Sequence, residues 1–195
     1  MSTDFFDFDT QIDFMFPAGA LYVPGAERIL PKVAALNRYA AMLGLPLIST
    51  MDAHTENDPE FRAWPPHCVV GTVGQGKASV TLQEPRIVLP AHPSEFELAG
   101  ARQVLLEKQT TDCFTNANLD SLLNRLQAEE AVVYGVVTEI CVAHAIRGLL
   151  RRNLRVTLVQ DAVMELDSSA SQALEAELVG AGGQLVMASQ VCDCD

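Results

Sequence analysis

Residues 131–151, AVVYGVVTEICVAHAIRGLLR, pass from a continuous apolar run into an amphipathic helical stretch. An apolar run of this kind is typical of a strand that is buried on both faces of a parallel sheet. Because the same alternation recurs along the chain, we expect a three-layer α/β fold, with helices on both faces of a doubly wound, mostly parallel sheet. The predicted strands are 4–9, 46–51, 102–107, 131–137, 154–160 and 184–188, and the predicted helices lie near 27–43, 117–128, 141–151 and 168–181.

The length and charge of the chain restrict the kind of protein it can be. Its 195 residues fit a single domain, 1–195, with one long irregular stretch at about 52–100 that is expected to be functional. The net charge of −12 argues against a nucleic-acid partner, because phosphates repel such a surface. No apolar run approaches the ~20 residues of a membrane helix, and Met1–Phe5 carries no basic signal-peptide region. We therefore expect a cytoplasmic protein without membrane contacts.

Four of the predicted strands end at residues that can do chemistry. Asp9, Asp52 and Lys108 close three apolar runs, and Cys141 lies just beyond a fourth. Ligands bind at the carboxyl ends of strands in such sheets, so these side chains are expected at one edge. A helix N-terminus lowers the pKa of a thiol, and a nearby acid and lysine can take its proton and hold the thiolate. The alternative is structural, with Cys141 as a buried apolar residue and Lys108 as a side chain that reaches solvent.

A second group of polar residues begins at Asp52. His54 follows two residues later, His67 lies further along the irregular stretch, and Glu60 lies between the two histidines. Two imidazoles and a carboxylate are a common ligand set for a first-row metal, and Glu60 is close enough in sequence to be a fourth ligand. The alternative is that these are ordinary polar residues of an exposed loop.

Two short patterns allow more than one interpretation. GTVGQGK at 71–77 satisfies the first part of a phosphate-binding loop, but Ala78 stands where a Ser or Thr would hold magnesium. Nucleotide binding through Lys77 is therefore a remote alternative. The terminal CDCD, with Cys192 and Cys194, could bind a soft metal but is better explained as an exposed tail.

Several separated motifs resemble the isochorismatase-like cysteine hydrolases and, within them, the nicotinamidases. The similarity runs in the family's order from about Phe8 to Asp161. It implies the isochorismatase-like hydrolase fold and a catalytic trio of Asp9, Lys108 and Cys141. The motifs are FDTQIDF (8–14), PAGAL (17–21) with VPGAE (23–27), TMDAHTEND (50–58), WPPHCVVGT (64–72), LLEKQTTDCF (105–114) and GVVTEICVAHA (135–145).

The resemblance also implies the remaining parts of a site. A divalent metal ion, zinc or else iron or manganese, is expected on Asp52, His54 and His67, with Glu60 where some members have a fourth ligand. The substrate ring is expected against Phe14, Trp64 and Phe114. The oxyanion donors would be the backbone N–H groups of Val137 and Cys141, with a cis peptide bond between Val136 and Val137.

The implied activity is hydrolysis of a small-molecule amide, nicotinamide to nicotinate and ammonia, through a thioester on Cys141, a reaction of NAD salvage. Val137 and Ile140 differ from the residues that are common in nicotinamidases. Hydrolysis of another small amide, or of a carbamoyl or ureido compound, is therefore the alternative. The family often forms dimers or tetramers, so a homo-oligomer is expected.

The three aspartates of FFDFDTQIDF (5–14) are expected to differ in role. Asp9 is the candidate base, and Asp13 is expected to cap the following turn through local hydrogen bonds. Asp7 conflicts with a buried strand, because an unpaired buried carboxylate is costly. Either Asp7 has a partner or the strand is less buried at this point.

Overall fold

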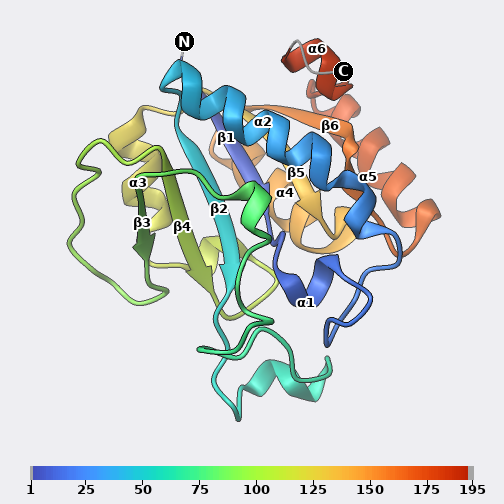
Figure 1. Cartoon of the computed structure of the whole chain (residues 1–195). Helices are drawn as coiled ribbons and strands as arrows, with labels where there is room; N and C mark the ends of the chain where they lie inside the picture. Colours follow the sequence, from blue (N-terminus) through green and yellow to red (C-terminus); the bar gives the residue numbers. More distant parts are fainter. Residues whose placement is uncertain (1, 193–195) are drawn as a thin grey trace.

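The computed structural model describes residues 2–192, in which seven parallel strands form one sheet in the order β3-β4-β2-β1-β5-β6-β7 (Figure 1). The predicted α/β fold with a parallel sheet is confirmed. The strands are β1 (Thr3–Phe8), β2 (Leu47–Asp52), β3 (Arg86–Leu89), β4 (Gln103–Lys108), β5 (Glu130–Val136), β6 (Arg155–Met164) and β7 (Gln184–Val186).

Helices cover both faces of the sheet. Figure 1 shows α2 across the near face, where α6 also packs, and α4 behind the strands. Two ion pairs connect the helices on that second face. Arg147 of α4 pairs with Glu177 of α5, and Arg152, which follows α4, pairs with Asp120 of α3. None of the helices within residues 2–192 has the length and apolar character needed to cross a bilayer. The helices are α1 (Ile12–Met15), α2 (Leu30–Leu43), α3 (Leu119–Leu126), α4 (Ala143–Arg151), α5 (Ser168–Gly180) and α6 (Ala188–Val191).

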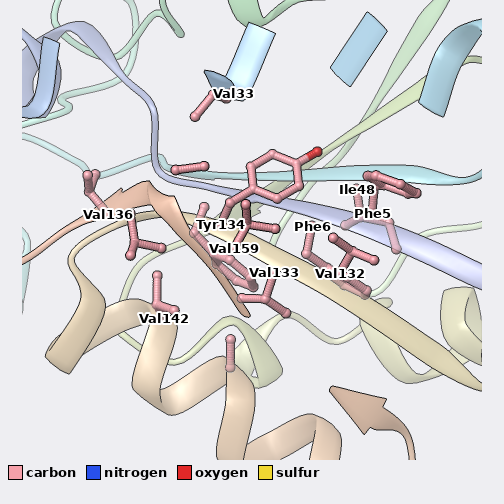
Figure 2. Packing of buried hydrophobic residues seen from close by; sticks show 14 of the residues in the cluster. Phe5, Phe6, Val33, Ile48, Val132, Val133, Tyr134, Val136, Val142 and Val159 are labelled. Carbon is pink, nitrogen blue, oxygen red and sulfur yellow. The ribbon is translucent and has the colours of Figure 1, made fainter. Parts of the chain in front are cut away.

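The core lies on both sides of the central strands. In Figure 2, Val33 of α2 lies on one side of these strands and Val142 on the other. The fully buried Tyr134 of β5 points toward α2, where its hydroxyl donates to Asn37 Oδ1 at 2.7 Å. Burying apolar side chains on both faces explains why the central strands read as continuous apolar runs.

The sequence does not predict the short helices α1 and α6, and β6 continues beyond the predicted strand to Met164. Three further differences concern the edge of the sheet and the strand ends. The edge strand β3 lies inside the stretch predicted to be irregular, and its pattern is weak because Arg86 and Val88 face solvent. Strand β1 ends at Phe8, one residue before Asp9. Cys141 does not open an α-helix, since it lies in a π-helical turn, Thr138–Val142, ahead of α4.

Asp7 is fully buried and has several partners. Its carboxylate accepts hydrogen bonds from Thr10 Oγ1 at 2.8 Å, Asn37 Nδ2 at 3.0 Å and Ser49 Oγ at 3.1 Å. Lys77 Nζ lies 3.3 Å from Asp7 Oδ2, and both side chains are excluded from solvent. Of the two alternatives that the sequence left open for Asp7, the structure therefore shows the first, a buried carboxylate with partners. Because the Lys77 ammonium is buried in this ion pair, it is not available to a phosphate, and nucleotide binding through it is not supported.

The glycine-rich segment 71–77 supports the chain next to it. Ile12 donates its N–H to the Gly76 carbonyl at 2.8 Å, and Asp13 donates to the Gly74 carbonyl at 3.1 Å. A Cβ on Gly74 would lie 2.3 Å from the Asp13 carboxylate, so only glycine allows this close approach. The segment therefore holds α1 in place.

The C-terminal cysteines are only partly described. Cys192 follows α6 and is buried, and its Sγ lies 3.4 Å from the carbonyl of Ala188, the first residue of that helix. The prediction of an exposed tail is wrong for this residue, because it packs against α6. Cys194 lies outside the described residues.

Candidate active site

Asp9, Asp52, Lys108 and Cys141 meet at the carboxyl edge of the sheet. Lys108 Nζ lies 2.9 Å from Asp9 Oδ2 and 4.0 Å from Cys141 Sγ, and it donates a hydrogen bond to Asp52 Oδ1. All four side chains are buried. The structure therefore brings together the acid, lysine and thiol that the sequence placed at separate strand ends.

The backbone of Asp9 is turned toward this cluster. Its φ of 51° is in the left-handed region, which non-glycine residues rarely adopt outside special sites. Thr50 of β2 donates from Oγ1 to Asp9 Oδ1 at 2.6 Å and fixes the carboxylate. The sequence did not identify Thr50 as a site residue. The one indication in the sequence is that Thr50 is polar within the apolar run that ends at Asp52.

The buried charges of the cluster depend on one another. Burial alone would lower the pKa of Lys108, but the carboxylates of Asp52 and Asp9 outweigh it and raise that pKa well above its usual range. Burial raises the pKa of the Cys141 thiol well above its usual range, against the lowering effect of Lys108 and with a further rise from Asp9. The lowered thiol pKa predicted from the sequence is therefore wrong, because burial outweighs the nearby cation. A buried neutral thiol needs a base beside it before it can attack.

The turn that carries Cys141 follows a cis peptide bond. The bond between Val136 and Val137 is cis, as the resemblance implied. The Val137 carbonyl then accepts N–H bonds from Ile140 at 3.1 Å and Val142 at 3.2 Å, which close the turn around Cys141. This turn presents the thiol to a cavity that Val137 and Ile140 also line.

Asp52, His54 and His67 form a second cluster next to Lys108. Their ligand atoms all lie within 4.8 Å of one another, and His54 Nε2 and His67 Nε2 lie 3.7 and 3.5 Å from Asp52 Oδ2. Within residues 2–192, Nε2 of the buried His54 has no hydrogen-bond partner. Two imidazoles and a carboxylate converging on one point, with an unsatisfied buried nitrogen among them, fit a divalent metal ion.

Groups behind the two imidazoles orient them. His67 Nδ1 lies 2.7 Å from the Pro65 carbonyl, and His54 Nδ1 lies 3.2 Å from Asp58 Oδ2. Both Nε2 atoms are left directed at Asp52, which is the usual arrangement behind metal-binding histidines. Burial lowers the pKa of His54, but the carboxylates of Asp52 and Asp58 raise it and prevail. The sequence did not identify Asp58 as a site residue. The one indication in the sequence is its position, four residues after His54.

Two further residues hold these loops. Gln11 brackets the backbone of Asp52, accepting its N–H at 2.6 Å and donating to its carbonyl at 2.9 Å. Asp13 accepts from Ala20 N at 2.9 Å and from Cys68 N at 2.7 Å. The bond from Ala20 agrees with the expected capping of the following turn, and the second carboxylate oxygen also reaches a residue 55 positions away. Sequence analysis did not identify Gln11.

A small cavity connects the two clusters. Glu60 lies in its wall, outside the group formed by Asp52, His54 and His67, and burial followed by the Asp52 charge raises its pKa. The wall is largely apolar, and the part of it that the structure describes contains no arginine or lysine. The lining residues are Phe14, Leu21, Tyr22, Val23, Asp52, Glu60, Trp64, His67, Thr111, Val137, Ile140, Cys141 and Leu166.

Phe114 is placed differently from the other predicted ring contacts. Phe14 and Trp64 line the cavity, whereas Phe114 is not among the lining residues. The Arg152 guanidinium stacks on the Phe114 ring at 3.7 Å from its centroid, and a Cβ on Gly148 would lie 2.0 Å from the ring. Phe114 therefore packs against α4 instead of reaching the cavity, because its ring fills the space left by Gly148.

Comparison with known proteins decides the family. The sequence model of the isochorismatase domain matches residues 6–190. The chain belongs to the isochorismatase family. Its members with this fold include nicotinamidases, whose solved structures match at 20–23 % identity and show the fold alone.

Three relatives illustrate the reactions found in the isochorismatase family. The zinc-bound pyrazinamidase of Pyrococcus horikoshii is 27 % identical, with a TM-score of 0.81 over 96 % of this chain and 99 % of that one. The N-carbamoylsarcosine amidase of Thermoplasma acidophilum is 25 % identical, with a TM-score of 0.77 over 96 % and 97 %. The streptothricin hydrolase of Streptomyces noursei is 27 % identical over 80 % of this chain, which spans 48 % of that protein. The chain is thus an isochorismatase-family hydrolase.

Proposed function

We propose that this protein is a metal-dependent cysteine amidohydrolase whose substrate is nicotinamide, which it converts to nicotinate and ammonia. The observation that carries the proposal is the cavity, which has Cys141 and the Asp52–His67 cluster in its wall together with the apolar rings of Phe14 and Trp64. Such a cavity suits a flat, neutral aromatic amide. Pyrazinamide, the substrate named for the Pyrococcus relative, is a compound of this class.

Asp9 starts the reaction by taking the proton of the Cys141 thiol. The sulfur attacks the amide carbonyl and forms a carbon–sulfur bond, while the carbonyl π electrons move to oxygen. The backbone N–H groups of Val137 and Cys141 hold this oxyanion, and each such donor is worth about 3 kcal/mol in the transition state.

The intermediate then collapses with cleavage of the carbon–nitrogen bond. Asp9 delivers its proton to the leaving nitrogen, and ammonia departs to leave a thioester on Cys141. Asp9 next removes a proton from water, which attacks the thioester carbonyl. Cleavage of the carbon–sulfur bond releases nicotinate, and Asp9 returns its proton to the sulfur to restore the thiol.

Lys108 and the histidine cluster support these steps. Lys108, 4.0 Å from the sulfur, stabilises the thiolate as it forms and keeps Asp9 in position through their ion pair. Asp52, His54 and His67 would hold a divalent ion, zinc by preference and otherwise iron or manganese, which supplies a Lewis acid for the ring nitrogen of the substrate. We extend the proposal to a cytoplasmic dimer or tetramer that acts in NAD salvage.

A second candidate substrate class is a neutral carbamoyl or ureido compound. The half-buried Glu60 favours it, since a carboxylate in the cavity wall can accept bonds from additional N–H groups. A substrate that carries its own carboxylate, such as N-carbamoylsarcosine, fits poorly, because no arginine or lysine stands among the described lining residues to pair with it.

Ammonia release from a panel of small amides tests the proposal. The panel contains nicotinamide, pyrazinamide, a neutral ureido compound and N-carbamoylsarcosine, each with the wild type and with Cys141→Ala. We expect release from the two aromatic amides, abolished by Cys141→Ala. Turnover of the ureido compound alone would favour the second candidate, and turnover that persists in Cys141→Ala would contradict the covalent route.

A further inference from the structure

We infer that Glu139 is a positioning residue that holds Leu166 over the cavity and thereby limits the size of the amide that reaches Cys141. The inference rests on the proposed function for its substrate, but the contacts that carry it are independent of which amide is hydrolysed.

Leu166 is an unusual part of the cavity wall. It lines the cavity together with Val137, Ile140 and Cys141, yet it is 52 % exposed. It lies in the short connection between β6 and α5. A side chain that is half in solvent has few packing contacts to fix it, so its position over the cavity depends on how its backbone is held.

The Glu139 carboxylate holds that backbone. Glu139 Oε1 accepts the N–H groups of Leu166 at 2.9 Å and of Asp167 at 2.8 Å. Hydrogen bonds to an ionised carboxylate are stronger than bonds between neutral groups. Asp167 in turn caps α5 by accepting N–H groups from Ser169 and Ala170. The connection is therefore fixed on one side to a helix and on the other to Glu139.

Glu139 lies in the same turn as the nucleophile. It lies two residues before Cys141 in the turn Thr138–Val142. The carboxylate thus ties Leu166 to the same turn that presents the thiol, and the distance between Leu166 and the thiol is set within one rigid unit. Loss of the carboxylate would release Leu166 without removing any group that acts on the substrate.

Alkylation of Cys141 measures the opening of the cavity without any substrate. Rates at Cys141 are followed by peptide mass spectrometry, with iodoacetamide as the small reagent and N-phenylmaleimide as the bulky one. We compare the rate with N-phenylmaleimide to the rate with iodoacetamide. A change in thiol reactivity alters both rates alike and therefore cancels in their ratio. We expect Glu139→Ala to raise this ratio about fivefold, the factor for one net hydrogen-bond contribution. Leu166→Ala should raise it at least as much, because it removes the side chain itself.

Three comparisons separate positioning from general damage. Glu139→Gln keeps an acceptor oxygen but loses the charge, so its ratio should lie between those of the wild type and Glu139→Ala. Glu165→Ala removes a carboxylate from the β6–α5 connection itself and should leave the ratio unchanged. The double variant Glu139→Ala/Leu166→Ala should give no higher ratio than Leu166→Ala, because Glu139 acts through Leu166.

An unchanged ratio in Glu139→Ala, or an additive double variant, would overturn the inference. If Glu139→Ala fails to fold, Glu139→Gln and Leu166→Ala decide by the same ratio, with an intermediate rise expected for Gln. With nicotinamide as substrate, Leu166→Ala should raise KM several-fold and change kcat little. A wild type that does not hydrolyse nicotinamide would contradict the proposed function while the alkylation ratios still decide the role of Glu139.

Discussion

Asp7 and Lys77 form an ion pair inside the sheet, with 3.3 Å between Asp7 Oδ2 and Lys77 Nζ. Lys77 Nζ also donates to the Thr50 carbonyl at 3.1 Å, and the Thr50 hydroxyl holds Asp9. A lysine from the glycine-rich segment 71–77 therefore reaches beneath the active site and neutralises a carboxylate two residues before the proposed base.

Removing one partner of this pair should be strongly destabilising. Lys77→Met leaves the Asp7 carboxylate buried without its counter-charge, and we expect a loss of about 3 kcal/mol in the free energy of unfolding. Urea denaturation measures it. The control is Lys32→Met, since Lys32 is partly exposed and 3.9 Å from Asp161. The double variant Asp7→Asn/Lys77→Met should recover part of the loss, and a single variant as stable as the wild type would contradict the pair's importance.

Asp4 should make the protein less stable as the pH rises. This buried residue of β1 has one carboxylate oxygen, Oδ2, without a hydrogen-bond partner in the described chain, and burial raises its pKa from 3.8 to about 6. The folded state binds the proton more tightly than the unfolded state, so this contribution to stability is full below pH 3.8 and is lost as the pH rises through about 6.

The matched variant for this effect is Asp4→Asn, which stays neutral. We expect it to be more stable than the wild type at pH 8 by about 3 kcal/mol, with the advantage disappearing near pH 4. Thermal unfolding between pH 4 and pH 8 measures the difference. A constant difference across this range would show that Asp4 does not titrate as its burial implies.

Thr50→Val tests the proposed role of Asp9 without removing the carboxylate. The change deletes the 2.6 Å hydrogen bond to Asp9 Oδ1 and keeps the shape of the side chain. We expect kcat to fall about tenfold with KM little changed, since a charge-assisted bond of this kind is worth about 1.5–3 kcal/mol. The control Thr157→Val makes the same exchange in β6. Equal losses in both variants would point to a general effect on the sheet.

Asp58→Asn should weaken metal binding through His54. The Asp58 carboxylate lies 3.2 Å from His54 Nδ1, and loss of such a partner typically lowers metal affinity about 10–100-fold. Titration of the metal-free protein with Zn²⁺ by calorimetry measures this. Glu56→Gln, in the exposed part of the same loop, is the matched control. Equal affinities in wild type and Asp58→Asn would remove Asp58 from the site.

The features that could be predicted from the sequence lie at the ends of apolar runs. The central strands are buried on both faces, so their patterns are clear and place Asp9, Asp52, Lys108 and Cys141 at one edge. The edge strand β3 lacks such a pattern because solvent covers Val88.

Contacts between distant residues could not be predicted in the same way. Asp7 and Lys77 are 70 positions apart, and nothing in their spacing shows that they pair. The motif places Phe114 correctly in the chain but does not give the direction of its ring, which depends on the space left by Gly148 on α4. Burial also reversed the expected direction of the Cys141 pKa, because local sequence does not report how much water is excluded.

The measurement that tests the central claim most directly is the mass of the protein after rapid acid quenching during turnover of nicotinamide. We expect a transient mass increase of one nicotinoyl group, located on the peptide that contains Cys141 and absent in Cys141→Ala. Turnover of nicotinamide with no acylated protein at any quench time, or with acylation on another residue, would contradict Cys141 as the nucleophile.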